Sequence, residues 1–290
     1  MFYKLNENID WNGLSLNPNA IHILEQYPDK ICWDLLSKNS NAIHILEKNI
    51  DKICWENLML NHNAYPIFIK HLDKIYWSFL AGNHNAIDLI EQNLNKMNWT
   101  LLSMNPTTVH LLEKYPDNIN WYTLSLNPNA IHLIEQNIDD IDWDLLSKNS
   151  NAIHILEKNL DNINWLHLSQ NPNAIYIIEQ NLDKINWSWL SQNPNAIHLL
   201  EKYPDRIYWK YLSLNPNAIR ILEQNIDKIN WTFLSRNPNA IHLIAPLDYD
   251  KLKNNELLEE LISYVFNPIR IHKLCGLYTL EFDELLSILS

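Results

Sequence analysis

The stretch at residues 121–142 reads WYTLSLNPNAIHLIEQNIDDID, and close copies of it fill most of the chain. Tryptophan recurs every 22 residues, so eleven of the twelve Trp residues are evenly spaced without any insertion or deletion. They are Trp11, Trp33, Trp55, Trp77, Trp99, Trp121, Trp143, Trp165, Trp187, Trp209 and Trp231. A fixed short period is the signature of a repeat architecture, whose units pack on their neighbours. The sequence therefore predicts a repeat array over residues 1–244 and a different segment over residues 245–290.

Several positions are the same in nearly every repeat. If Trp is position 0, Leu occupies +3 and Asn occupies +6 in all eleven repeats, Ser occupies +4 in nine, and Ala occupies +9 in ten. These residues stay the same in nearly every repeat, whereas the exposed positions differ from repeat to repeat. We therefore interpret them as structural ladders, with buried rows of Trp and Leu and a row of capping Asn. The second and sixth repeats supply Trp33, Leu36, Asn39, Trp121, Leu124 and Asn127.

Two short helices per repeat explain this pattern. Asn at +6 is followed by Pro in seven repeats, which is typical of a helix N-cap and first turn. The apolar positions +9, +10, +12 and +13 then share one helical face. Asp or Asn precedes Trp in seven repeats, which predicts the N-cap of a shorter helix from Trp to Ser. Neither helix is long enough to be stable alone, so stability must come from stacking.

The resulting fold class is all-α. We predict a right- or left-handed α-solenoid of about eleven two-helix repeats, on the order of 100 Å long, with a C-terminal helical cap on the last repeat. A leucine-rich-repeat-like solenoid is the alternative, because it also has short repeats and a ladder Asn. Its L-x-x-L-x-L-x-x-N pattern is missing here, which favours the all-helical fold.

The third repeat departs most from the others. It carries Pro66 within the predicted second helix, Ile69 where Glu is usual, and His71. Proline inside a helix removes a hydrogen bond and clashes with the preceding turn, so we expect a shift or kink there. The two interpretations are a specialised patch and neutral drift in one repeat.

Composition excludes several classes of partner. The net charge is −12 and no basic stripe is present, which disfavours nucleic acid. The first residues lack a signal-peptide pattern, and no run of about 18 apolar residues could span a membrane. Cys32, Cys54 and Cys275 are expected to be free thiols. We therefore expect a cytoplasmic protein that is not secreted and does not bind membranes.

Histidine is the main candidate for site chemistry. It occupies +11 in seven repeats, and in six of them Glu follows three residues later, as in His22 and Glu25. We expect a local pair on one helix face. Two ligands per repeat fall short of the three or four that a metal site needs, so no metal is expected. No phosphate loop or catalytic motif is present, and we expect neither an enzyme nor a cofactor.

Binding is expected where the repeats differ, at the variable positions +1, +2, +5, +11, +15 and +19. Position +2 is aromatic or His in the last four repeats, at His167, Trp189, Tyr211 and Phe233. These side chains could line one binding surface. The alternative is that they only extend the core.

The segment after the array has its own pattern. Residues 249–266 read as an amphipathic helix, which is either a cap for the last repeat or a docking module for another protein. Its candidate docking residues are Tyr264, Phe266, Arg270 and Phe282.

The NPNAIHLLE-type repeats with spaced Trp resemble the short tryptophan/asparagine repeat proteins of giant DNA viruses of amoebae. The ending ELISYVFNPIRI, followed by LEFDELL, is similar to a C-terminal module of such proteins, although Asn267 stands where His commonly precedes the Pro. The resemblance implies a viral protein that acts in the host cytoplasm or virus factory, and it implies no catalytic residues. We expect a non-enzymatic scaffold that binds another protein, with a monomer favoured. The alternative is a structural or particle-associated assembly component, and an enzyme or metal-binding protein is less favoured.

Overall fold

The computed structural model describes residues 5–246, in which Glu7–Ile244 form one compact unit. This part of the chain contains only α-helices and 3₁₀ helices, so the predicted all-α repeat fold is confirmed. The leucine-rich-repeat-like alternative is wrong for these residues, because it requires a strand in each repeat. The predicted C-terminal cap lies outside the described residues, apart from Ala245 and Pro246.

Each repeat has a first helix that begins at Trp and a second helix that begins at +10. The first helices are α1 (Trp11–Leu16), α3 (Trp33–Leu36), α5 (Trp55–Leu58), α7 (Trp77–Leu80), α9 (Trp99–Met104), α11 (Trp121–Leu124), α13 (Trp143–Leu146), α15 (Trp165–Leu168), α17 (Trp187–Leu190), α19 (Trp209–Leu212) and α21 (Trp231–Leu234). The second helices are α2 (Ile21–Gln26), α4 (Ile43–Glu47), α6 (Tyr65–Phe68), α8 (Ile87–Gln92), α10 (Val109–Lys114), α12 (Ile131–Gln136), α14 (Ile153–Lys158), α16 (Ile175–Glu179), α18 (Ile197–Lys202), α20 (Ile219–Glu223) and α22 (Ile241–Ile244). The 3₁₀ helices are η1 (Pro18–Ala20), η2 (Pro28–Lys30), η3 (Ile50–Lys52), η4 (Leu72–Lys74), η5 (Leu94–Lys96), η6 (Pro116–Asn118), η7 (Leu160–Asn162), η8 (Pro204–Arg206) and η9 (Ile226–Lys228).

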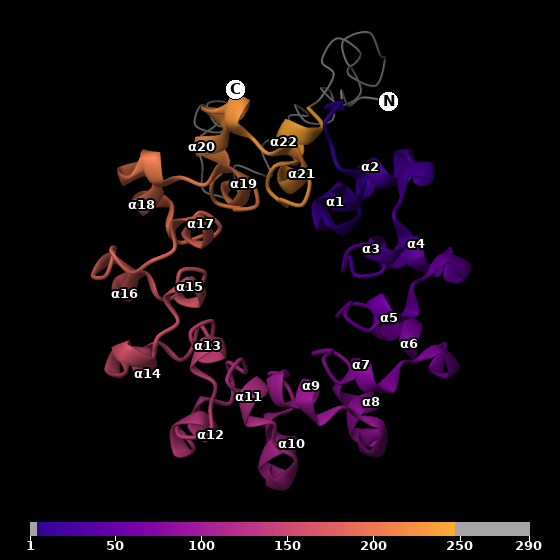
Figure 1. Cartoon of the computed structure of the whole chain (residues 1–290). Helices are drawn as coiled ribbons and strands as arrows, with labels where there is room; N and C mark the ends of the chain where they lie inside the picture. The colour runs from indigo at the N-terminus through magenta and orange to yellow at the C-terminus, as the bar shows by residue number, and fades with distance from the viewer. Residues whose placement is uncertain (1–4, 247–290) are drawn as a thin grey trace, which may run out of the picture. The chain divides into compact units, whose positions relative to one another are not determined.

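The helices form two concentric layers. The first helices make the inner layer and the second helices make the outer layer (Figure 1). Leu at +3 is fully buried between the layers, as at Leu36 and Leu124, and Ala at +9 is fully buried beside it, as at Ala42 and Ala130. The small Ala side chain lets the second helix begin close to the first, so each repeat is a thin layer.

Asparagine at +6 joins each repeat to the one before it. The Asn127 side-chain Nδ2 donates to the carbonyl oxygens of Ser103 and Asn105, both at 2.9 Å, and its Oδ1 accepts from the Asn129 N–H at 3.0 Å. Asn39 makes the same three bonds one repeat after the first, and both side chains are buried. Asn at +6 therefore forms a buried row of side chains, each of which bonds the backbone of the preceding repeat.

The role of this Asn at the helix start differs from the prediction. Its Oδ1 caps a turn, or η1 in the first repeat, and the second helix begins only at +10. The predicted N-cap at +6 is therefore wrong for the second helix. The reason is that the amide group must reach two carbonyls of the preceding repeat, which places a turn of three residues between Asn and the helix.

Serine at +4 forms a second ladder. The Ser125 hydroxyl donates to the Trp121 carbonyl oxygen at 3.1 Å and accepts at 2.9 Å from the N–H of Asp142, which immediately precedes the next Trp. The hydroxyl thus bonds a backbone carbonyl of α11 and the backbone N–H of Asp142, the residue just before α13, so it links the first helices of successive repeats and explains why Ser recurs at this position.

The array closes into a ring, because repeat 1 stacks on repeat 11 as the other repeats stack on each other (Figure 1). Asn17 Nδ2 donates to the carbonyl oxygens of Ser235 and Asn237, at 3.1 and 2.9 Å. The Asp10 N–H donates to Ser235 Oγ at 2.9 Å, and Asn19 Nδ2 donates to the Pro238 carbonyl at 2.9 Å. These are the bonds that every regular seam makes, so the two ends of the array are joined by an ordinary repeat contact.

The expected length of the solenoid, on the order of 100 Å, is therefore wrong as an end-to-end distance, because repeat 1 contacts repeat 11. The outer layer contains a second helix and, in eight of the described repeats, a 3₁₀ helix after it, whereas most inner helices have four residues. Each repeat is consequently wedge-shaped, and the eleven repeats together complete one turn. The last repeat does not present a bare apolar end within Glu7–Ile244, because repeat 1 covers it.

The third repeat keeps the common fold. Pro66 lies in the first turn of α6, where its missing N–H has no intrahelical partner to lose. The predicted kink is absent, and the helix is only shorter than most others of its layer. The unusual property of this region is its exposed apolar surface, which comprises Leu60, Ile69, Leu72, Tyr76 and Phe79.

Candidate functional site

The aromatic residues at +2 form a continuous row on the inner-layer helices. The rings of Trp189 on α17 and Tyr211 on α19 are stacked, with centroids 5.0 Å apart and planes 19° apart. Phe233 on α21 meets Tyr211 edge-on at 6.0 Å and 74°. All three side chains are half-buried, so the stack is partly available to a partner. We call Trp189, Tyr211 and Phe233 the aromatic ladder.

Two neighbours of the aromatic ladder were missed by the sequence analysis. The ring centroids of Tyr208 and Tyr211 are 5.4 Å apart, and the Lys210 ammonium lies 4.9 Å from the centre of the Phe233 ring. Tyr208 stands where most repeats have a capping Asn or Asp, and it is three residues before Tyr211, so the helical spacing could have indicated this contact.

His167 belongs to the same +2 row but bonds in another way. Its Nδ1 lies 2.9 Å from the Asp144 carbonyl oxygen of the preceding repeat. The structure therefore brings three of the four predicted +2 residues into ring contact. The predicted docking residues Tyr264, Phe266, Arg270 and Phe282 lie outside the described residues.

The row of Trp at position 0 is less buried than predicted. All eleven side chains, including Trp33 and Trp121, are half-buried, whereas the Leu and Asn ladders are buried. The Trp row is thus an edge of the core and not its centre. The Trp33 and Trp187 indoles each line a groove between successive repeats.

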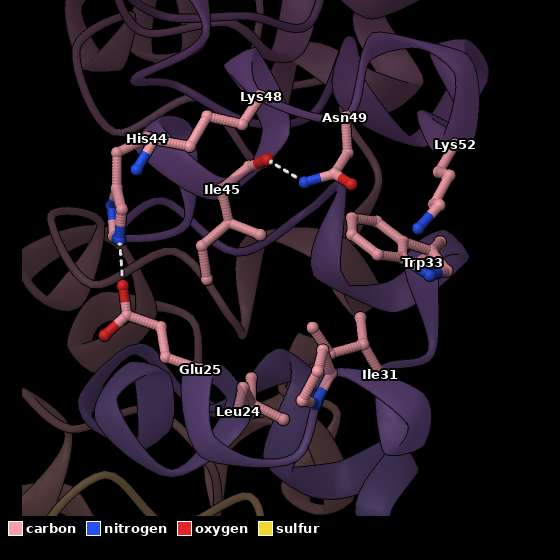
Figure 2. A pocket seen from close by; sticks show the side chains of 10 residues that line it. Leu24, Glu25, Ile31, Trp33, His44, Ile45, Lys48, Asn49 and Lys52 are labelled. Atoms are coloured by element: carbon pink, nitrogen blue, oxygen red, sulfur yellow. Dashed lines mark hydrogen bonds and ion pairs between the residues drawn. The ribbon is translucent and has the colours of Figure 1, made fainter.

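Figure 2 shows this groove between repeats 1 and 2. It has a volume of about 250 Å³, an apolar floor that includes Leu24, Ile31 and Ile45, and the Trp33 indole as one wall. The Lys52 ammonium lies 4.7 Å from the centre of the Trp33 ring. The groove therefore combines an aromatic face, an apolar floor and a charged rim.

The same groove recurs at other seams. Equivalent positions line cavities between repeats 2 and 3, with Ile50 and His71, and between repeats 8 and 9, with Trp187 and Tyr203. A ring geometry explains the recurrence, because helices on the outside of a closed ring must lie farther apart than those on the inside.

The His residues at +11 pair across repeats. His44 Nε2 lies 2.8 Å from Glu25 Oε1 of the preceding repeat (Figure 2), and five further His residues make the same contact. Those pairs are His110–Glu91, His132–Glu113, His154–Glu135, His198–Glu179 and His242–Glu223. The prediction that each His pairs with the Glu three residues later on its own helix is therefore wrong for the five of these His residues that have such a Glu, for example His44. Stacking places the His of one repeat directly against the Glu of its neighbour.

A second His arrangement lies at +7 in repeats 3 and 4. The rings of His62 and His84 are stacked at 4.4 Å, and His62 Nδ1 accepts from the His84 backbone N–H at 3.2 Å. Burial and the neighbouring His62 lower the pKa of His84 below its ordinary value of 6.5. The folded protein therefore favours the neutral form of the His84 ring.

Acidification is expected to weaken this seam. His84 takes up a proton at its ordinary pKa in the unfolded protein but only at a lower pH in the folded protein. The unfolded state therefore binds more protons as the pH falls below about 6.5, and the free energy of unfolding decreases. The variant His84→Ser has the residue that repeats 2 and 7 carry at this position. In urea titrations its free energy of unfolding should decrease less between about pH 7.5 and 5.5 than that of the wild type. Equal losses in the two proteins would show that the His pair has no such role.

The remaining polar groups are accounted for structurally. Ser at +4 bonds two backbone groups, and among residues 5–246 no three or more His, Cys, Asp or Glu side chains are arranged to hold a metal ion. Cys32 and Cys54 are free and half-buried, as predicted, while Cys275 lies outside the described part. No helix in the part of the chain that the structure describes is both long and apolar enough to cross a membrane.

Comparison with known proteins adds no relative. No protein-family model matches the chain, and neither a curated protein nor a solved structure shows significant similarity to it.

Proposed function

We propose that this protein is a non-enzymatic ring that binds another protein through its aromatic ladder. The observation that carries the proposal is the contiguous, half-buried stack of Trp189, Tyr211 and Phe233. Large aromatic side chains contribute most of the binding energy at protein interfaces. Most other repeats have smaller or aliphatic residues at +2, so this stack distinguishes one arc of the ring.

The charge near the aromatic ladder indicates the chemistry of the partner. Residues 187–245 contain six Lys and Arg but only four Asp and Glu, although the whole chain has a net charge of −12. Lys210 and Arg236, both exposed, belong to this arc. A protein segment with apolar side chains between carboxylates fits such a surface.

The resemblance of the repeats to those of giant-virus proteins supports a viral origin and a role in the host cytoplasm or virus factory. In this proposal the partner is a host or viral protein, and the ring acts as a monomer. An assembly component is the second candidate function. Because repeats 1 and 11 contact each other, rings could join only through their faces or rims and not end to end.

Placing charges on the aromatic ladder is expected to abolish partner binding. The triple variant Trp189→Glu, Tyr211→Glu, Phe233→Glu should weaken binding by 100-fold or more, since each hot-spot aromatic contributes about 2 kcal/mol. The measurement is quantitative affinity capture from host-cell extract, followed by titration of the captured protein.

A matched control is Tyr122→Glu with Leu166→Glu, because both residues are exposed on inner-layer helices outside the aromatic ladder. This control should retain the partner. Capture of the same proteins at the same level by the triple variant would contradict the proposal. Light scattering tests the second candidate function, because assembly requires a mass that rises with concentration.

A further inference from the structure

The indole face at position 0 is covered in one of two ways. In four repeats an aromatic or His ring at +16 meets the Trp ring, with centroids 5.2 to 5.8 Å apart. These pairs are Trp11–Tyr27, Trp55–His71, Trp99–Tyr115 and Trp187–Tyr203. In four others, +16 is Asn and a Lys at +19 places its ammonium 4.5 to 5.0 Å from the ring centre. These pairs are Trp33–Lys52, Trp77–Lys96, Trp165–Lys184 and Trp209–Lys228.

Repeats 6 and 7 have neither cover. Position +16 is Asn in both, and position +19 is Asp140 after Trp121 and Asn162 after Trp143. Among the ten repeats described through position +19, only these two indoles have no ring or ammonium partner. Since both are half-buried, each retains an exposed part that no other side chain of the described chain covers in this way.

Repeat 2 provides an internal reference for repeat 7. Residues 33–49 and 143–159 have the identical sequence WDLLSKNSNAIHILEKN. The groove of Figure 2 is lined by this stretch in repeat 2, and there Lys52 lies over Trp33. At the matching position repeat 7 has Asn162. Repeat 7 therefore keeps the aromatic wall, and Lys158 at the position of Lys48, but has no Lys at the position from which Lys52 covers the ring.

The charge around the two indoles favours a cation from outside. Repeats 6 and 7, residues 121–164, contain seven Asp and Glu but only two Lys and Arg. Asp139, Asp140 and Asp161 are exposed, and none has an ion-pair partner among the described residues. A cation over an indole is attracted by the ring electrons, and nearby carboxylates strengthen this attraction.

We propose that Trp121 and Trp143 bind two Lys or Arg side chains of a basic protein segment, in the position that Lys52 occupies over Trp33. Neighbouring helices lie about 8–10 Å apart, which matches about three residues of an extended chain. The site therefore suits two basic residues separated by two others. It is independent of the aromatic ladder, which lies in a more basic arc of the ring.

The test uses the full chain and the acetylated, amidated peptide GKAAKG as the probe. The indole ¹⁵N–¹H signals of Trp121 and Trp143, assigned with Trp→Phe variants, should shift on titration. Asp140→Lys with Asn162→Lys supplies the missing cations and should weaken binding at least tenfold. The same peptide with acetylated lysines should not bind.

Two further variants separate local from general electrostatics. Asp117→Lys with Asn118→Lys makes the same charge change beside Trp99, which Tyr115 already contacts, and should leave affinity within about twofold. Lys52→Asn converts repeat 2 to the state of repeat 7, and the Trp33 indole signal should then also respond to the peptide. The proposal is overturned if Asp140→Lys with Asn162→Lys binds like the wild type, if acetylated peptide binds equally, or if neither indole signal moves.

Discussion

Gly13→Leu is expected to open the ring. A Cβ at Gly13 would lie 2.9 Å from Ser235 Cβ, closer than two side-chain carbons can approach, and 3.1 Å from Arg236 Cγ. Separation of the seam would break the four hydrogen bonds between repeats 1 and 11, worth about 1 kcal/mol each. We therefore expect about 4 kcal/mol of lost stability from these bonds, and a larger radius of gyration in small-angle X-ray scattering.

An open ring also exposes two complementary faces, which form heterologous contacts between molecules. The variant should therefore associate as its concentration rises. Gly82→Leu is the matched control, because a Cβ there meets only the Phe79 carbonyl oxygen at 3.6 Å. Leucine also occupies this +5 position in repeats 1, 3, 6 and 10. If Gly13→Leu keeps the wild-type radius and unfolding midpoint, close approach at Gly13 is not needed for closure.

Ring closure shows why the fold of a single repeat can be predicted from the sequence, whereas the shape of the array that the repeats form cannot. The 22-residue period fixed which residues meet at each seam, and Asn17 follows that rule even across the closure. The rotation between repeats depends instead on the relative thickness of the two layers, which no single residue encodes. Two signals were nevertheless present, because repeat 1 has the full Asn ladder in place of a polar end cap, and Gly13 is the only Gly at +2.

Burial of the Trp row was overestimated for a related reason. An invariant residue is needed in every repeat, but it can be needed at an edge as well as in the centre. Leu124 is fully buried while Trp121 is half-buried, although both are equally regular in sequence. Similarly, the spacing of His44 and Glu47 suggested a pair within one helix, whereas stacking gives His44 the Glu25 of the preceding repeat.

Some contacts in the candidate sites follow from the repeat pattern, and others depend on the path of the chain within a repeat. The aromatic ladder could be predicted, because equal positions in successive repeats must lie side by side in any stacked array. The Lys52–Trp33 contact could not, since position +19 lies in η3, whose path returns the chain toward its own Trp. The difference between Lys52 and Asn162 was visible in the sequence but acquired meaning only with that geometry.

Asn127→Asp is expected to be among the most destabilising single changes in the array. The substitution replaces the Nδ2 donor by an oxygen that faces the carbonyl oxygens of Ser103 and Asn105. Two hydrogen bonds become repulsive contacts, and a carboxylate is introduced where the side chain has 0% exposure. The combined cost should be about 4 kcal/mol or more, which corresponds to a fall of roughly 10 °C in the unfolding midpoint measured by circular dichroism.

The stability of the Asn127→Asp variant should depend on pH in a characteristic way, because Oδ1 of residue 127 keeps its hydrogen bond. The Oδ1 bond from the Asn129 N–H survives in the Asp variant, so protonation of the new carboxyl removes the buried charge and restores part of the stability. The variant should therefore recover toward the wild type as the pH falls from about 7 to about 5. Asn129→Asp is the control, because that exposed amide makes one bond to the neighbouring repeat, to Pro106, and its loss should cost about 1 kcal/mol or less. If the two variants unfold at the same temperature, the buried Asn ladder contributes no more than a surface contact, and the seams must be held together by the Ser ladder and by apolar packing.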